Sequence, residues 1–128
     1  PGMGIATGFV NSALSKAELA FWPAFARGVL CNWLVSMGVW MSYAAADVTG
    51  RIIPTAMAVS AFVMFGGEHS VANMFYLPAG FMIRARMSAL PAPSIFRNMA
   101  SVTLGNIVGG GLLVAAVYWA AYLRKGRK

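Results

Sequence analysis

"IIPTAMAVSAFVMFGGEHSVANMFYLPAGF", residues 52–81, is a long apolar stretch that is interrupted near its centre by a polar group. The interruption holds Glu68 and His69, and this histidine is the only one in the chain. A glycine pair, Gly66 and Gly67, comes directly before them. Adjacent glycines loosen a helix and can open its hydrogen-bond ladder. We therefore expect two half-helices that are joined at the glycines.

This stretch is longer than a single straight membrane crossing requires, which is about 20 apolar residues. The half-helices would cover about 52–65 and 68–81, with the break near 66–67. Irregular backbone at membrane depth is tolerated only where it is buried in protein or lines a cavity. The stretch therefore predicts a broken membrane helix that holds His69 beside an internal path.

The overall composition indicates that the chain faces lipid. Hydrophobic residues make up 59% of its 128 residues, and charged residues only 10%. A soluble domain carries about 25% charged residues, because its surface must face water. Two further runs, Gly28–Ala46 and Asn98–Leu123, contain no charged side chain. We therefore expect an all-α membrane protein with three transmembrane helices, at about 23–46, 52–81 and 99–123.

The basic residues, which give the chain a formal net charge of +7, follow the ends of these expected spans. Arg51, Arg84, Arg86 and Arg97 flank spans, and the basic tail at 124–128 reads RKGRK. Membrane insertion produces this placement, whereas a nucleic-acid site needs a basic patch with aromatic side chains. We therefore expect no nucleic-acid partner, and a multi-pass protein of the inner (cytoplasmic) membrane whose C-terminal tail is cytoplasmic.

The N-terminal part is too polar to form a span. Its apolar residues recur at three- and four-residue steps, which is typical of an amphipathic helix that lies at the membrane interface. We expect residues 1–22 to be an interfacial amphipathic linker and residues 23–128 to form the membrane domain with its tail. Pro1 is not an initiator methionine, and no signal peptide precedes the first span, so we expect a piece of something longer.

The sequence predicts neither a cofactor nor a metal site. Cys31 is the only cysteine and lies inside a span, and no metal-ligand spacing occurs. We interpret Cys31 as a small apolar packing residue. No nucleophile is paired with a base, so we expect no catalytic residues and no enzyme activity.

Polar side chains inside the expected spans are costly unless they find a partner or line water. Asn32 lies in the first span, and His69 is the most plausible partner for it. His69 and Asn73 are four residues apart and would share one helix face. Glu68 would begin the second half-helix, where the helix dipole favours a carboxylate, and it could pair with a basic residue. His69 could instead make an ordinary hydrogen bond between helices, but the adjacent glycine break favours a role in a pore.

Three segments carry a resemblance to a known family. They are "GVLCNWLVSMGVWMS" (28–42), "GGEHSVANMFYLPAG" (66–80) and "TLGNIVGGGLLVAAVYW" (103–119). In this order they resemble the two characteristic segments and the last helix of the formate–nitrite transporter family. The resemblance extends from Lys16 to Leu123.

The resemblance implies an aquaporin-like fold with six membrane helices in two inverted three-helix repeats. Family members assemble as homopentamers with one pore in each protomer. This chain would correspond to the second repeat, and the first three-helix repeat would be a missing partner. The inverted-repeat plan places the substrate path between the two halves, with broken helices at its centre. A companion chain or cleavage of the linker would reconcile the family's plan with this length.

The resemblance also implies roles for individual residues. His69 corresponds to the central pore histidine, and Asn32 to the pore-facing asparagine. Lys16 corresponds to a lysine that draws anions toward the pore, at the same sequence distance before that asparagine. Phe62 and Val35 correspond to apolar residues that narrow the pore on its extracytoplasmic side, although ordinary packing would also explain both.

The remaining matches complete the functional expectation. Glu68 corresponds to the acid beside the histidine, and Asn73 and Asn106 correspond to positions with a mainly structural role. We expect transport of a small monovalent anion, namely formate, nitrite or hydrosulfide, linked to a proton through His69. An imidazole with a pKa of about 6.5 can gain a proton and pass it to an anion. Two alternatives stay open: a channel for neutral solutes such as water or glycerol, and a structural membrane subunit that transports nothing.

Overall fold

The computed structural model of the chain describes residues 2–84 and 92–124. Nearly all of them are helical and none lies in a strand, which confirms the predicted all-α class. The sequence-predicted roles of Arg86 and of residues 125–128 of the basic tail lie outside the described residues. In chain order the helices are α1 (Gly2–Ala17), α2 (Phe21–Tyr43), α3 (Val48–Met64), α4 (Ser70–Arg84) and α5 (Ala92–Asn106). Helix α5 continues without a break through the π-helical η1 (Ile107–Ala115), the single α-helical turn α6 (Ala116–Tyr118) and the π-helical η2 (Trp119–Leu123).

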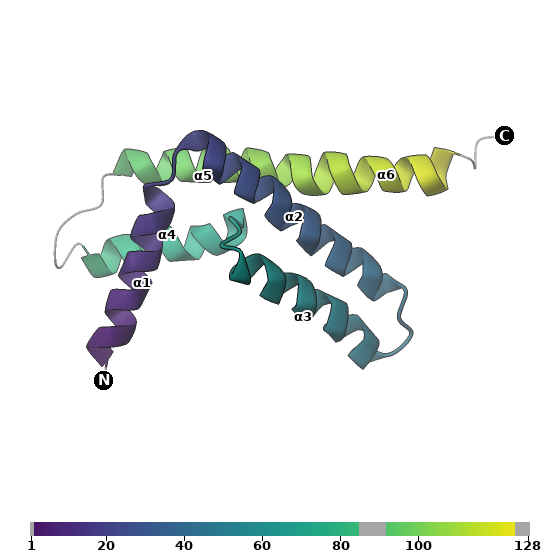
Figure 1. Cartoon of the computed structure of the whole chain (residues 1–128), viewed down its shortest axis with the longest axis horizontal. Coiled ribbons are helices and arrows are strands. Elements are labelled where there is room, and N and C mark those ends of the chain that lie inside the picture. Colours follow the sequence, from purple (N-terminus) through teal and green to yellow (C-terminus); the bar gives the residue numbers. More distant parts are fainter. Residues whose placement is uncertain (1, 85–91, 125–128) are drawn as a thin grey trace.

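Helices α2 and α3 form an antiparallel pair, as their short connection predicts (Figure 1). The connection ends at Asp47, whose Oδ1 accepts a hydrogen bond from the Gly50 backbone N–H at 2.8 Å and so caps the start of α3. The two helices approach closely at Gly38, where a Cβ would overlap with Ala58 and lie 3.1 Å from the Pro54 carbonyl oxygen. A larger residue at this position would push α3 away from α2.

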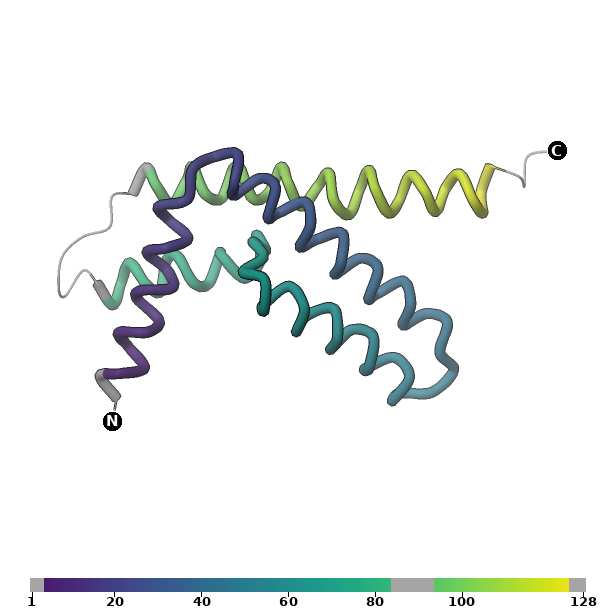
Figure 2. The backbone as a smooth tube through the Cα atoms, in the orientation of Figure 1, coloured from purple at the N-terminus to yellow at the C-terminus, as the bar shows by residue number. Residues whose placement is uncertain are grey.

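The apolar stretch at 52–81 is divided between α3 and α4, and the backbone changes direction between them (Figure 2). Gly66 has φ +68°, a conformation that residues other than glycine adopt at a cost. The Gly67 N–H donates a hydrogen bond to the Phe62 carbonyl at 2.7 Å, which closes the last turn. Helix α4 begins at Ser70, two residues later than the predicted second half-helix. Glu68 and His69 therefore lie in the connection itself.

The last helix is one long rod that runs from α5 through η2 (Figure 1). It begins at Ala92, whereas the sequence predicted an irregular segment before a span at 99–123. Pro93 is the second residue of the rod, where the missing proline N–H needs no partner. Among the described residues, Ser94–Leu123, with 30 residues, is the one helix long and apolar enough to cross a membrane by length and composition.

Glycines allow α2 to cross this rod at very short range. A Cβ on Gly105 would overlap with the Phe25 carbonyl, and a Cβ on Gly109 would overlap with the Val29 carbonyl. On α2, a Cβ on Gly28 would lie 2.9 Å from the Val102 carbonyl oxygen. Small residues at helix crossings let two backbones approach in this way. The four-residue spacing of Gly105 and Gly109 places both on the face of the rod that meets α2.

Helix α1 packs across α4 and touches α5, so it is not an isolated linker. Ala13 faces Gly80 at a point where a Cβ on that glycine would overlap with the alanine side chain. Ala17 and Leu77 are fully buried where α1 and α4 meet. The sequence-predicted linker at 1–22 thus contains α1 and the first two residues of α2. Its location at a membrane interface stays a prediction.

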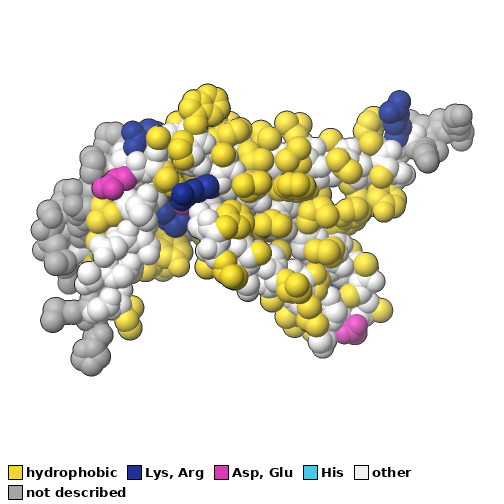
Figure 3. Space-filling model, in the orientation of Figure 1, with side chains coloured by type: hydrophobic (Ala, Val, Ile, Leu, Met, Phe, Trp, Pro, Cys, Tyr) yellow, Lys and Arg dark blue, Asp and Glu magenta, His cyan; other side chains and the backbone are white. Residues whose placement is uncertain are grey.

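Many large hydrophobic side chains are exposed on the surface, and several polar side chains are buried in the interior together with apolar ones. Trp22 is 73% exposed and Met64 is 86% exposed, whereas Glu68 is only 2% exposed. Hydrophobic side chains cover much of the face that Figure 3 shows, and charged side chains occupy a few places on it. An extended apolar surface of this kind marks contact with lipid or with further protein.

Candidate functional site

A buried polar cluster lies behind the break between α3 and α4. Glu68 Oε1 accepts a hydrogen bond from Lys16 Nζ at 2.8 Å, and Glu68 Oε2 accepts one from Asn73 Nδ2 at 2.6 Å. Asn73 Nδ2 also donates to Asn98 Oδ1 at 2.9 Å, and Asn98 Nδ2 donates to the Lys16 carbonyl at 2.7 Å. The cluster therefore joins α1, the connection, α4 and α5. Glu68 has a basic partner, as the sequence suggested.

Asn106, at the end of α5, fixes the backbone of the break. Its Nδ2 donates to the carbonyls of Gly28 and Glu68, each at 2.9 Å. Its Oδ1 accepts a hydrogen bond from the Ser70 N–H at 2.9 Å. Three backbone groups on two other segments thus share one side chain. The orphan N–H groups at the start of a helix need such partners, and Asn106 supplies one for α4.

His69 is only partly exposed and lies between two pockets. One pocket, of about 430 Å³, is lined by His69 together with Asn32 and Asn106. The other, of about 230 Å³, is lined by His69 together with Lys16 and Phe62. Among the described residues, His69 is the one that lines both of these pockets. A group in either pocket can reach it.

The imidazole is positioned by an aromatic contact. The rings of His69 and Phe62 are stacked, with centroids 5.9 Å apart and an interplanar angle of 29°. No hydrogen bond is formed by the His69 side chain within the described residues. The alternative role for this histidine, a structural hydrogen bond between helices, therefore has no partner in the described part of the chain. Its ring nitrogens are available to a ligand.

Two sequence-based expectations about the polar residues are wrong. Asn32 does not pair with His69, because its Nδ2 donates to the Asn106 carbonyl at 2.7 Å. Asn73 does not line the pockets with His69, because His69 precedes the first residue of α4 and the Asn73 side chain is fully buried beside Glu68. Asn32 and His69 nevertheless line the same pocket.

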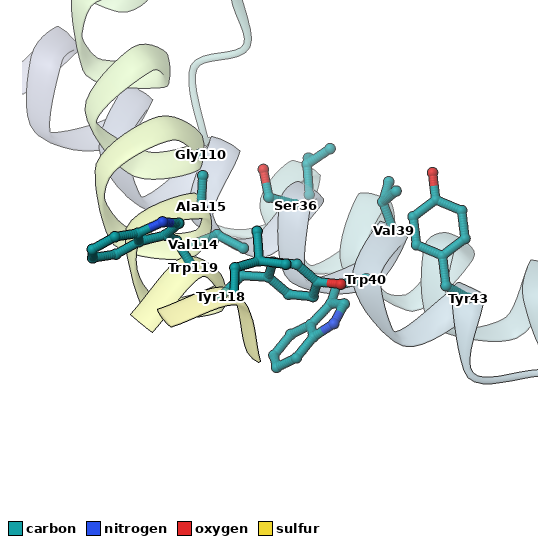
Figure 4. Close-up of a pocket in the computed structure, with 11 residues that line it drawn as sticks. Ser36, Val39, Trp40, Tyr43, Gly110, Val114, Ala115, Tyr118 and Trp119 are labelled. Atoms are coloured by element: carbon teal, nitrogen blue, oxygen red, sulfur yellow. The ribbon is translucent and has the colours of Figure 1, made fainter. Parts of the chain in front are cut away.

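The two residues of the predicted constriction lie in different places. Phe62 lines the pocket of His69, whereas Val35 lines a groove of about 680 Å³ between α2 and the far part of the rod. Figure 4 shows this groove, with Trp40 from α2 and Tyr118 and Trp119 from the rod. A constriction that includes both Phe62 and Val35 therefore needs walls from outside this chain.

Asn98 is the residue that sequence reasoning missed. In the sequence it only begins an uncharged run, yet it is fully buried, accepts a hydrogen bond from Asn73 and donates one to the Lys16 carbonyl. The available signal was its chemical type, since a buried asparagine must find partners. Within the described residues, no three side chains among His, Cys, Asp and Glu gather closely enough to hold a metal ion.

The sequence profile described as formate/nitrite transporter matches residues 2–120. The chain belongs to the formate/nitrite transporter family. Over 94% of its length it is 42% identical to a probable formate transporter of Methanothermobacter thermautotrophicus, and covers 41% of that protein. Over 91% of its length it is 37% identical to the formate channel FocA of Escherichia coli (strain K12), and covers 46% of that protein.

A solved structure of this family has the same fold. A pentameric formate channel with formate bound superposes with a TM-score of 0.78 and 32% identity. The match covers 92% of this chain and 52% of that one. The chain thus spans about half the length of the family members that it matches.

Proposed function

We propose that this chain forms one half of a transmembrane path for a small monovalent anion such as formate, nitrite or hydrosulfide. The observation that carries the proposal is the position of His69, which joins two pockets in the break between α3 and α4. A titratable side chain without a protein partner at such a junction is suited to meet a passing solute. The relatives named as formate channels favour an anion as that solute.

The other half of the path would come from a first three-helix repeat. The matched channel structure is about twice as long as the aligned part and is pentameric, so we propose an aquaporin-like six-helix protomer within a homopentamer. The inverted-repeat arrangement puts the substrate path between the halves, beside the broken helices. The protein would lie in the inner membrane, with its basic C-terminal tail in the cytoplasm.

The mechanism rests on the protonation of His69. A protonated imidazole attracts an anion and donates a proton to it, and the resulting neutral acid crosses an apolar constriction at a lower cost than the anion. Phe62, which is stacked on the imidazole, presents an apolar wall at the same point. Val35 would add to the constriction together with residues of the first repeat. Lys16 supplies less attraction than its charge suggests, because Glu68 lies 2.8 Å from it.

Uptake into proteoliposomes tests the proposal. The vesicles hold this chain together with a first three-helix repeat, and uptake of formate, nitrite and hydrosulfide is compared with water and glycerol flux at several pH values. We expect saturable anion uptake that rises as the pH falls and is lost in His69→Asn. Tyr76→Phe is the control, since it removes a hydroxyl from the same pocket and leaves the imidazole in place.

One result would overturn the proposal, and another would remove only its proton step. Flux of water or glycerol without anion flux would assign a neutral-solute channel to this fold. Unchanged anion uptake and pH dependence in His69→Asn would leave an anion channel but remove the proton step.

A further inference from the structure

Arg27 extends from α2 to the break between α3 and α4. One guanidinium nitrogen, Nη1, lies 3.8 Å from the position that a Cβ on Gly66 would occupy. Gly66 lines the smaller pocket, which also contains Lys16 and His69. Arg27 and Asn32 are separated by five positions, which corresponds to about 7–8 Å along a helix axis. The guanidinium therefore lies beside Gly66, at the edge of the pocket that Lys16 and His69 line.

Arg27 has no counter-ion among the residues that the structure describes. The chain contains only three acidic residues. Glu68 is paired with Lys16, and Asp47 caps α3 at the end far from the break. Glu18 makes no ion pair with Arg27 in the described part of the chain. The charge of Lys16 is thus compensated by a carboxylate, whereas the charge of Arg27 is not.

The place of Arg27 is favourable for a cation even without an acid. It lies beside the C-terminal end of α3, which ends at Met64. The last carbonyls of a helix carry a partial negative charge and attract a positive group. The arginine can therefore hold its position at the break while its outer N–H groups stay available to a ligand. Its side chain is exposed in this chain.

We propose that Arg27 forms an anion-receiving site for planar oxoanions at the Gly66 edge of the His69 pocket, an inference that rests on the proposed transport function. A guanidinium presents two parallel N–H groups that match two oxygens on one planar centre. Formate and nitrite have this O–C–O or O–N–O geometry. Hydrosulfide has a single sulfur, so the two parallel donors must converge on one atom and both hydrogen bonds are bent. Arg27 therefore favours planar oxoanions over hydrosulfide before either reaches His69.

The test compares three variants in proteoliposomes that hold both halves of the protomer. Arg27→Gln removes the charge and the fork, and Arg27→Lys keeps the charge but removes the fork. Arg51→Gln is the matched control, because Arg51 is exposed in the first turn of α3, at the end far from the break, and its Nε donates a hydrogen bond to the Ala45 carbonyl at 3.1 Å. KM is measured for formate, nitrite and hydrosulfide.

We expect Arg27→Gln to raise the KM for formate and nitrite about ten-fold or more, which is the effect of losing a charge-assisted hydrogen bond. Arg27→Lys should raise both KM values by several-fold and leave the KM for hydrosulfide nearly unchanged. Arg51→Gln should leave all three KM values unchanged.

Two outcomes overturn the inference and leave the proposed function intact. The first is an unchanged KM for formate in Arg27→Gln. The second is an equal rise for all anions in Arg27→Gln and Arg51→Gln, which would indicate general electrostatic attraction. If the unaltered protein takes up no anion, the proposed function itself fails, and the two failures are therefore distinguishable.

Discussion

Lys16 Nζ and Glu68 Oε1 lie 2.8 Å apart and join two parts of the chain that are separated by 52 positions. This contact attaches the end of α1 to the connection that carries His69. The Glu68 side chain is 2% exposed and that of Lys16 is 20% exposed, so water screens the pair only weakly. The position of the histidine therefore depends on a salt bridge between two residues to which the sequence assigns separate roles.

Removal of the lysine should destabilise the fold more than removal of the acid. Lys16→Met leaves a buried carboxylate whose remaining partner is Asn73, and breaking a buried pair in this way costs about 3–5 kcal/mol. Glu68→Gln leaves the cation on the more exposed lysine, so its cost is smaller. Unfolding of the complete protein in detergent, induced by heat or by a denaturant, measures the loss of unfolding free energy in both variants.

The double variant Lys16→Met/Glu68→Gln completes a thermodynamic cycle for this pair. It should lose less stability than the sum of the single variants, with a coupling free energy of about 0.5–3 kcal/mol. Strictly additive losses would show that the contact contributes nothing as a pair.

Asn106 should be required both for stability and for transport. In Asn106→Ala the carbonyls of Gly28 and Glu68 and the N–H of Ser70 lose their shared partner, and each buried polar group left alone costs about 1–3 kcal/mol. We expect lower thermal stability and slower anion uptake, because the backbone that positions His69 is released. Asn11→Ala, on an exposed face of α1, is the control and should change neither. Equal effects of the two substitutions would contradict this account of Asn106.

Much of the helical plan follows from the sequence alone. The long apolar stretch, the glycine pair and the short turn at Asp47 predict a helix hairpin followed by a broken helix, because these signals are local. The start of the last helix was misplaced. Its first turns contain Arg97 and Asn98, which a hydropathy argument assigns to a loop, whereas both side chains donate hydrogen bonds to carbonyls at the end of α1 and so attach this helix to α1.

The partners of the polar residues could not be predicted in the same way. A spacing of four places His69 and Asn73 on one face only when both belong to the same helix, whereas α4 begins at Ser70 and His69 precedes it. Arg27 lies near the start of α2, where an arginine ordinarily extends to lipid headgroups. Its position beside Gly66 depends on the angle between α2 and α3, which one sequence does not specify.

The conformation of Gly66 should make it intolerant of substitution. At φ +68° an alanine pays about 1–2 kcal/mol for the left-handed conformation. Gly8→Ala is the matched comparison, because Gly8 lies within α1 with nothing within 4 Å of an added Cβ. That change should stabilise the helix by about 0.5–1 kcal/mol. Thermal unfolding of both variants should give shifts of opposite sign, and equal shifts would show that the break tolerates an ordinary residue.

The crossing of α2 over the rod should be the most size-sensitive contact in this chain. An alanine Cβ at Gly105 would overlap with the Phe25 carbonyl and lie 3.1 Å from the Val29 nitrogen, so the two helices must separate. Overpacking of this kind costs about 1–3 kcal/mol. Separation also lengthens the hydrogen bond from Asn32 to the Asn106 carbonyl, which is now 2.7 Å. Gly111→Ala is the control for stability, because the nearest atom to its added Cβ is 4.0 Å away. We expect Gly105→Ala to lower the unfolding temperature and Gly111→Ala to raise it slightly, as alanine does in a helix. A similar rise in both would mean that backbone proximity does not limit this crossing.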